Sequence, residues 1–404
     1  TAIEEIDLKT QLRRLLSMAN KTASTFLAKP VNHLYMLLVS AGALTFIGLI
    51  MVFSASSIRA IDTQGSAASI VIRQLLFVVV SIPLAAYLSK LPIVRWEFIG
   101  RIGLVISMAL LGLLLIPGLG KTVNGNTNWI NLKIFDVQPS EFAKLLMILW
   151  ASYLLARKEK SGRHSTNVVK LIAPGFLIIM AMIMYGHDLG TTSVVAAILA
   201  GLLFVSGIQL RVLGWITAAG ALALTFLIAT SGYRAQRFLV FLNPFAPEDY
   251  KNIGWQPAHS LLGLATGGLF GVGLGGSRQK WGNLPEAHTD FIFSVIGEEL
   301  GLVGTLTVLI LLAVLIYSIF RIALRAQDPM IRYACAGIGI WITVQAFLNI
   351  GSATSVLPVV GVTLPLVSYG GSALVATLCA IGFVAGAALR DPAVRKEIVK
   401  KQKK

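Results

Sequence analysis

About ten long apolar stretches follow one another along this sequence of 404 residues. A helix needs about 20 mainly apolar residues to cross the hydrocarbon core of a bilayer. Only 13% of the residues are charged, against about 25% in soluble domains. The sequence therefore predicts an all-α, polytopic integral membrane protein with about ten transmembrane helices, centred within residues 34–54, 71–88, 102–116, 142–156, 169–185, 189–206, 212–230, 291–320, 333–350 and 373–389.

The distribution of basic residues predicts the orientation of these helices. The net charge is +16, and a cytoplasmic N-terminus would place 24 of the 34 Lys and Arg residues on the cytoplasmic side. Because Lys and Arg concentrate in cytoplasmic loops, we expect both termini to be cytoplasmic. The predicted organisation is a cytoplasmic basic leader at 1–33, a membrane domain at 34–389 and a cytoplasmic basic tail at 390–404. The longest loop, at about 231–289, then connects helices seven and eight outside the cytoplasm.

The composition also argues against other classes of protein. A nucleic-acid-binding protein needs a basic face on a folded soluble module, and the sequence contains no such pattern. The two cysteines, Cys335 and Cys379, lie in apolar stretches and offer neither a disulfide framework nor the spacing of metal ligands. We therefore expect no nucleic-acid partner, and we interpret the cysteines as packing residues.

Polar segments open the fourth, sixth, eighth and tenth predicted helices, all of which begin on the outer side of the membrane. These segments start at Gln138, His187, His288 and Ser368. Because helix N-termini carry free N–H groups and a partial positive charge, they suit an anionic ligand such as a phosphate. Helix capping is the alternative, since Asp188 is a good N-cap residue and Pro139 suits a first helical position. Gly370 and Gly371 could equally serve a tight turn.

Glu141 and Lys144 are three residues apart, so they lie on one face of the fourth predicted helix and can form an ion pair. An ionisable residue at membrane depth is costly and is usually functional. The pair could fix helix packing alone, or it could also position a substrate or a proton.

The long loop combines basic residues with a glycine-rich run at 267–277. The run loosely resembles a dinucleotide-binding fingerprint, but no strand–helix–strand unit surrounds it. Close packing of a re-entrant segment is the better interpretation of the glycines. Arg234, Arg237, Arg278 and Lys280 could neutralise an anion, or each could simply face lipid headgroups.

Asp290 is the strongest candidate for a catalytic residue. It precedes a strongly apolar helix, so burial should favour its neutral form and raise its affinity for protons. A carboxylate with this property can act as a general base. Steps of four residues would place Asp290, Ser294 and Glu298 on one helix face. Capping of the helix is the alternative role for Asp290.

Taken together, these motifs resemble the SEDS family of bacterial membrane proteins (shape, elongation, division and sporulation), over about residues 34–389. The sequence departs from the family pattern at Asn128, where Arg is usual before Trp129, and at His187, where Pro is usual before Asp188. The motifs that carry the resemblance are MVFSAS at 51–56, NG at 124–125, QPSEFAK at 138–144, DLGTT at 188–192, Tyr233, Arg234, Arg237, LPEAHTDFIF at 284–293, EELG at 298–301, LP at 357–358 and LPLVSYGGS at 364–372.

The resemblance implies a peptidoglycan glycosyltransferase that polymerises lipid II at the outer face of the cytoplasmic membrane. Asp290 would deprotonate the 4-hydroxyl of the acceptor GlcNAc. That oxygen would attack the anomeric carbon of a MurNAc carrying undecaprenyl diphosphate, with inversion to a β-1,4 link. The substrate-binding residues implied by the resemblance, together with the residues that could assist the diphosphate, are Glu141, Lys144, Arg234, Arg237, Lys280, His288, Ser368, Gly370 and Gly371. The metal ligands are unknown, and the one candidate cofactor is a divalent cation beside the diphosphate.

The resemblance also implies partners and a cellular place. They are a cognate class B penicillin-binding protein, other proteins of the division machinery, and the division septum of the bacterial inner membrane. Gln345 and Asn349, with the run GIGIW at 337–341, look closer to FtsW-like division members than to RodA-like elongation members. Three alternatives stay open here: a RodA-type polymerase of cell elongation, a flippase that moves lipid II across the bilayer, and a non-catalytic scaffold for division proteins. Many transporters have inverted repeats and broken helices near the midplane, whereas the polar residues of this sequence gather at one face.

Overall fold

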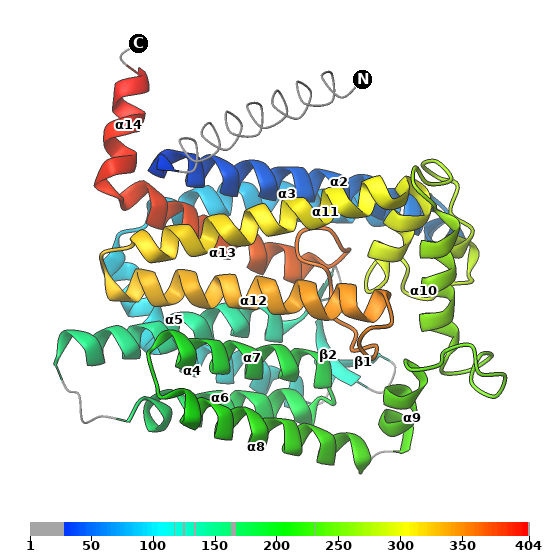
Figure 1. The fold of residues 1–404 in the computed structure, drawn as a ribbon, viewed down its shortest axis with the longest axis horizontal. Coiled ribbons are helices and arrows are strands. Elements are labelled where there is room, and N and C mark those ends of the chain that lie inside the picture. Colours follow the sequence, from blue (N-terminus) through cyan, green and yellow to red (C-terminus); the bar gives the residue numbers. More distant parts are fainter. Residues whose placement is uncertain are drawn as a thin grey trace, which may run out of the picture.

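The computed structural model describes residues 28–116, 118–123, 126–132, 135–162, 167–230 and 232–402. Most of the predicted basic leader and the motif at 124–125 therefore lie outside the described residues. Ten long helices occupy the ten predicted apolar stretches (Figure 1). They are α2 (Pro30–Gln64), α3 (Ser69–Lys90), α4 (Ile93–Gly112), α5 (Pro139–Lys160), α6 (Val168–Tyr185), α7 (Leu189–Val205), α8 (Leu210–Ala229), α11 (Ile292–Arg325), α12 (Pro329–Ala353) and α13 (Gly371–Arg390).

Seven of the described helices are long and apolar enough to span a membrane, namely α2, α3, α4, α6, α11, α12 and α13. The apolar helices α7 and α8 are shorter by this measure. α5 carries charged residues at both ends and does not meet it. The chain is thus a mainly helical, multi-pass membrane protein.

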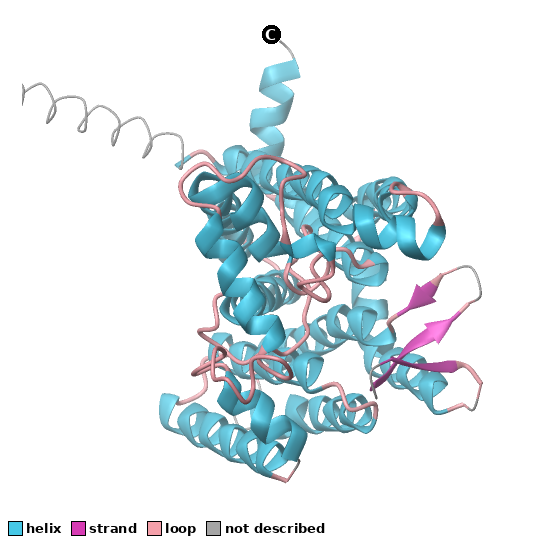
Figure 2. Cartoon of the chain, turned by 90° about the vertical axis from the view of Figure 1, so that its right-hand side faces the viewer, coloured by secondary structure: helices cyan, strands magenta, loops and turns pink. Residues whose placement is uncertain are grey.

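Two features differ from the prediction. The third predicted stretch begins nine residues too late, because α4 starts at Ile93 and continues through the charged residues Arg95, Glu97 and Arg101. The expectation of an all-α chain is wrong in one place, where three short strands form an antiparallel sheet (Figure 2). These strands are β1 (Gly120–Val123), β2 (Asn126–Asn131) and β3 (Asp136–Val137).

The core of the bundle lies around α12 and α13, the most deeply buried of the seven spans. α12 packs against α5, α7 and α11, and α13 packs against α2, α3 and α5. α8 lies at the edge of the bundle beside α7, with most of its side chains exposed. The residues that meet around α5, α12 and α13 are therefore shielded by surrounding helices.

The loop between α8 and α11 contains three short elements, α9 (Gly232–Val240), α10 (Trp255–Thr266) and the 3-10 turn η2 (Gln279–Trp281). In Figure 1 these elements and the small sheet lie at one end of the bundle, whereas α14 (Pro392–Gln402) extends from the opposite end. The polar connections are thus concentrated at the end that the sequence places outside the cytoplasm.

The glycine-rich run packs against α11 at a break in that helix. A Cβ on Gly267 would lie 1.8 Å from the Gly297 carbonyl oxygen, and one on Gly271 would lie 2.1 Å from that of Glu299. Gly301 interrupts α11 with a φ of 65°, a conformation that favours glycine. Close backbone packing, as predicted, therefore explains these glycines.

Candidate functional site

Asp290 lies in the turn just before α11. The helix begins at Ile292, and Phe291 is its N-cap residue. The prediction that Asp290 shares a helix face with Ser294 and Glu298 is therefore wrong, because Asp290 is not in the helix. The alternative, that Asp290 caps the helix, is also wrong, because Phe291 is the N-cap residue and the helix has no side-chain capping hydrogen bond.

The turn is held by the segment that leads into α13. Ser368 Oγ donates a hydrogen bond to the Thr289 carbonyl oxygen at 2.6 Å. The Tyr369 N–H donates to the His288 carbonyl oxygen at 2.9 Å. Both contacts involve main-chain atoms of the turn, so Ser368 acts in this structure by fixing the chain beside Asp290.

The surroundings of Asp290 favour a carboxyl group that titrates near neutral pH. Burial raises the pKa of Asp290 to about 7; the Glu286 and Asp188 carboxylates act in the same direction, and Arg237 acts against them. The side chain still keeps some exposed surface. A carboxyl group of this kind can accept a proton from a substrate and release it again at physiological pH.

The Asp290 carboxylate receives no hydrogen bond from any side chain that the structure describes. The segment 358–363 passes directly beside it. A methyl group built on Gly361 would lie 3.5 Å from Asp290 Oδ2, and Gly361 has a φ of 70°. The carboxylate is thus placed by its backbone and left with free lone pairs.

An ion pair and a buried histidine lie just before Asp290. Arg59 Nη1 is 3.1 Å from Glu286 Oε1, and the Thr289 hydroxyl donates to Glu286 Oε2 at 2.9 Å. Burial lowers the pKa of His288 to about 4, with Arg59 contributing and Glu286 opposing. His288 is therefore neutral at pH 7 and can exchange hydrogen bonds with a substrate without adding charge.

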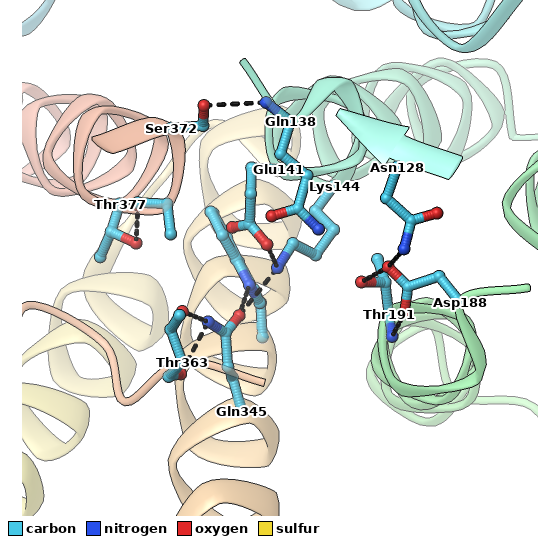
Figure 3. A network of polar contacts seen from close by, with 12 residues as sticks. Asn128, Gln138, Glu141, Lys144, Asp188, Thr191, Gln345, Thr363, Ser372 and Thr377 are labelled. Atoms are coloured by element: carbon cyan, nitrogen blue, oxygen red, sulfur yellow. Dashed lines mark hydrogen bonds and ion pairs between the residues drawn. The ribbon is translucent and has the colours of Figure 1, made fainter. Parts of the chain in front are cut away.

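The predicted ion pair of Glu141 and Lys144 is confirmed, and it is buried (Figure 3). Lys144 Nζ lies 2.8 Å from Glu141 Oε1, and the two side chains are 1% and 6% exposed. The same ammonium group donates to Gln345 Oε1 at 2.8 Å and lies 5.0 Å from the centre of the Trp341 ring. Pro139 occupies the first turn of α5, as predicted. The pair is thus built into the contact between α5 and α12.

The two positions at which the sequence departs from the SEDS pattern come together around Asp188. Asn128 Nδ2 donates to Asp188 Oδ2 at 3.1 Å, and His187 precedes Asp188 with a φ of 63°. The predicted capping role is confirmed, since Asp188 accepts from the Thr191 N–H at 2.8 Å. Burial raises the pKa of Asp188, although the Thr191 hydrogen bonds oppose that shift. A cavity of about 490 Å³ lies beside these residues, with Leu114 and Met182 on its apolar side.

Lys280 is held at the glycine-rich loop. Its ammonium group donates to the Gly275 carbonyl oxygen at 2.6 Å and lies 3.8 Å from Glu299 Oε1. Glu299 also accepts from the Ser54 hydroxyl at 2.7 Å. The charge of Lys280 is therefore already balanced by a buried carboxylate.

The two arginines of α9 are placed differently by the structure. Arg237 approaches Gln256 Oε1 at 3.4 Å and acts on Asp290 electrostatically. Arg234 belongs to the same helix, but its side chain lies outside the described residues. Arg237 is thus the described cation of this loop whose charge reaches Asp290.

Gly370 and Gly371 stand where α13 begins. The Gly370 N–H donates to Gln74 Oε1 at 3.3 Å. A Cβ on Gly371 would lie 2.4 Å from the Phe77 ring. Gly371 is explained by the close approach of α3, and Gly370 serves as the N-cap residue of α13.

Within the described parts of the chain, no three His, Cys, Asp or Glu side chains gather as ligands of a metal ion.

Sequence reasoning noted Gln345 and Asn349 only as markers of FtsW-like members and missed that these two residues join the parts of the site. Gln345 Oε1 accepts a hydrogen bond from Lys144 Nζ, and Gln345 Nε2 donates one to the Thr363 carbonyl oxygen at 3.0 Å. Asn349 Nδ2 donates to the Asp290 carbonyl oxygen at 2.8 Å. Both are polar residues in an apolar helix, a signal that the sequence offered without saying which distant segments they would contact.

The long apolar helices of the described residues, with polar residues around Asp290 at one end, define a multi-pass membrane protein. The chain belongs to the FtsW/RodA/SpoVE family of cell cycle proteins, whose model matches residues 34–391. The resemblance to the SEDS family is thereby confirmed.

Curated relatives and solved structures agree with this assignment. The probable peptidoglycan glycosyltransferase FtsW of Mycobacterium tuberculosis is 40% identical over 91% of this chain and 70% of its own length. Stage V sporulation protein E of Bacillus subtilis is 38% identical over 83% of this chain and 91% of its own. A chain of a peptidoglycan synthase complex, described for its coordination of polymerization and crosslinking, matches with a TM-score of 0.72 and 28% identity, over 89% of this chain and 98% of that one. The rod shape determining protein RodA of Thermus thermophilus matches with a TM-score of 0.65 and 28% identity, over 88% and 96%.

Proposed function

We propose that this protein is a peptidoglycan glycosyltransferase that polymerises lipid II into β-1,4 glycan strands. Family membership and the names of its relatives support this activity. The observation that carries the proposal is the Asp290 carboxyl group, which belongs to a half-buried residue, receives no hydrogen bond from a described side chain, and has a pKa raised to about 7 by burial. A general base works best when its pKa lies near the working pH.

In the proposed reaction Asp290 accepts the proton of the acceptor GlcNAc 4-hydroxyl. The oxygen forms a bond to the anomeric carbon of the donor MurNAc as the bond to undecaprenyl diphosphate breaks. Attack from the face opposite the leaving group gives inversion and a β-1,4 link. The proton then leaves Asp290 for water, and the diphosphate carries away the negative charge.

The departing diphosphate needs positive charge near it. Arg237 is the described candidate, since its charge already reaches Asp290, and Arg234 on the same helix is a second. Lys280 and Lys144 suit this role less well, because carboxylates already accompany both ammonium groups. Lys144 and Glu141 would instead shape the substrate cavity through Gln345.

The proposed orientation places the site at the outer face of the bacterial cytoplasmic membrane, with ten helices crossing the bilayer and both termini inside. The polar starts of α5 and α13 support it, because they meet at one end of the bundle, where the Gln138 N–H donates to Ser372 Oγ at 2.9 Å (Figure 3). The basic residues of α14 at the other end fit a cytoplasmic surface. Lipid II would then reach the site from the outer leaflet.

A role in septal wall synthesis is the best supported cellular function. Several relatives are named FtsW, at 36–41% identity over most of this chain. A class B penicillin-binding protein would be the main partner, and the likeness to a chain of a peptidoglycan synthase complex supports it. Other division proteins would bind the assembly at the septum.

The proposal is tested by polymerisation of purified lipid II with the full-length protein, alone and with its cognate penicillin-binding protein. Asp290→Asn should abolish glycan formation while the variant still folds and binds its partner. Asp136→Asn is the matched control, because that carboxylate makes an exposed ion pair with Lys121 on the small sheet. Full polymerisation by Asp290→Asn would refute the catalytic role, and movement of lipid II across proteoliposomes without polymer would favour a flippase.

A further inference from the structure

Three polar residues on one face of α12 hold the segment that runs beside Asp290. Gln345, Asn349 and Ser352 are spaced by four and three residues, so their side chains project from the same side of the helix. All three are buried. Each donates a hydrogen bond to a main-chain carbonyl of the segment 358–363. The row therefore holds an irregular segment against a rigid helix.

The three contacts differ in what else they hold. Gln345 Nε2 donates to the Thr363 carbonyl oxygen at 3.0 Å, and its Oε1 accepts from Lys144. Ser352 Oγ donates to the Pro358 carbonyl oxygen at 3.0 Å. Figure 3 shows Gln345 between Thr363 and the Glu141–Lys144 pair. One end of the row thus connects to the buried ion pair, and the other end reaches only the segment.

Asn349 is the member of the row that also holds the Asp290 turn. Its Nδ2 group donates to the Val362 carbonyl oxygen at 2.7 Å and to the Asp290 carbonyl oxygen at 2.8 Å. A flipped amide would direct its oxygen at both carbonyls, so the orientation of the side chain is fixed. Its own oxygen, Asn349 Oδ1, is buried and has no partner among the residues that the structure describes. A buried acceptor without a partner is unfavourable, so packing alone does not account for an amide at this position.

We propose that Asn349 is a positioning residue for the reaction at Asp290. Its amide ties the Asp290 carbonyl to the Val362 carbonyl, and so fixes the Asp290 carboxyl group relative to Gly361 and the segment 358–363. The same helix face links this point, through Gln345, to the Glu141–Lys144 pair. The inference rests on the proposed function, because it assigns to Asn349 the orientation of the Asp290 carboxyl group as the catalytic base.

The geometry explains why a small change at Asn349 should matter. Asp290 is outside the helix, so its direction depends on how its main chain is held. Displacement of a reacting group by about 1 Å can cost about 100-fold in rate. Loss of the amide also releases the Val362 carbonyl, which allows the segment to shift toward or away from the carboxylate.

The experiment compares Asn349→Ala with Ser352→Ala in the full-length protein. Ser352→Ala removes a hydrogen bond from the same helix face to the same segment but leaves the Asp290 turn untouched. For Asn349→Ala we expect kcat for lipid II polymerisation to fall about 10- to 100-fold with a nearly unchanged KM, and the acidic limb of the pH profile to move. Ser352→Ala should keep its profile and a rate within about twofold of the wild type.

A readout that does not need activity makes the test independent of the proposed function. The pH dependence of Asp290 labelling by a hydrophobic carbodiimide, followed by mass spectrometry of its peptide, reports the protonation of that carboxyl group. Asn349→Ala should shift the pH midpoint of Asp290 labelling. The charged residues that also act on Asp290, namely Glu286, Asp188 and Arg237, are all still present in this variant. Asn349→Leu, which keeps the approximate size of the side chain and adds no charge, removes the same two hydrogen bonds and should act in the same direction as Asn349→Ala; it serves where the alanine variant does not fold.

The outcomes separate the two claims. Equal effects of Asn349→Ala and Ser352→Ala, or an unmoved profile and labelling midpoint, would refute the positioning role and leave Asp290 as base. An inactive wild type with a shifted labelling midpoint in Asn349→Ala would refute the proposed activity and support the contact between Asn349 and Asp290.

Discussion

The two ends of α5 carry the same kinds of ionisable residues in opposite environments. At its start, Glu141 and Lys144 form a pair that is almost completely buried. At its end, Glu159 pairs with Arg332 while Lys160 pairs with Asp328, and these four side chains are 28–49% exposed. Exposed ion pairs contribute little to the free energy of folding. Buried charges, in contrast, are tolerated only where a partner and hydrogen bonds compensate their desolvation. The difference supports our proposal that the start of α5 is the functional end.

The same contrast separates the ends of α12. Its start contributes Asp328 and Arg332 to the exposed cluster. Its later turns contribute Gln345 and Asn349, which are buried and contact Lys144 and the Asp290 turn. α5 and α12 pack against each other, so both helices contribute to the exposed cluster at one end and to the buried network at the other.

The largest difference between the two ends of α5 is expected when one member of the buried pair and one member of an exposed pair are removed in separate variants. Lys144→Met leaves Glu141 as an uncompensated buried charge, and we expect unfolding of the purified protein in detergent to be easier by about 3–5 kcal/mol. Arg332→Met, which breaks the exposed pair, should cost about 0–1 kcal/mol. The double variant Glu141→Gln, Lys144→Met should recover much of the loss. Equal losses for Lys144→Met and Arg332→Met would show that the two ends do not differ as described.

A smaller effect is expected from packing at the functional end. Gly371→Ala would press a methyl group against the Phe77 ring, 2.4 Å away, and should destabilise the protein by about 1–3 kcal/mol. Gly42→Ala is the matched control on α2, because no described heavy atom lies within 4 Å of a Cβ there. Replacing a glycine in an open helical position should stabilise by about 0.5–1 kcal/mol. Thermal unfolding of the two variants measures the expected loss of stability in Gly371→Ala and the expected gain in Gly42→Ala. Unchanged stability of Gly371→Ala would mean that α3 and α13 can move apart.

The sequence predicted local features well because they depend on spacing. The positions of the long helices follow from the lengths of the apolar stretches, the pairing of Glu141 with Lys144 from their spacing of three residues, and the capping by Asp188 from the N-cap preference of Asp. The glycine-rich run was also interpreted correctly as a close-packed segment. These features need no knowledge of which distant elements meet.

Long-range contacts could not be predicted in the same way. Asn349 meets Asp290 across 59 positions of the chain, and Lys144 meets Gln345 across 201. The helix face predicted for Asp290, Ser294 and Glu298 is wrong, because an apolar run does not mark where the first helical turn begins. The small sheet was missed because its strands are short and lack an apolar alternation.

The pH dependence of polymerisation tests the central claim most directly, which is that Asp290 is the general base. Burial raises the pKa of this carboxyl group to about 7, and the base works only when deprotonated. The rate of the wild type, measured in a single turnover with purified lipid II, should therefore rise as pH increases through about 7 and then level off. Asp290→Asn should show no such rise. A wild-type rate that is constant from pH 5 to 9, or whose acidic limb persists in Asp290→Asn, would contradict the assignment.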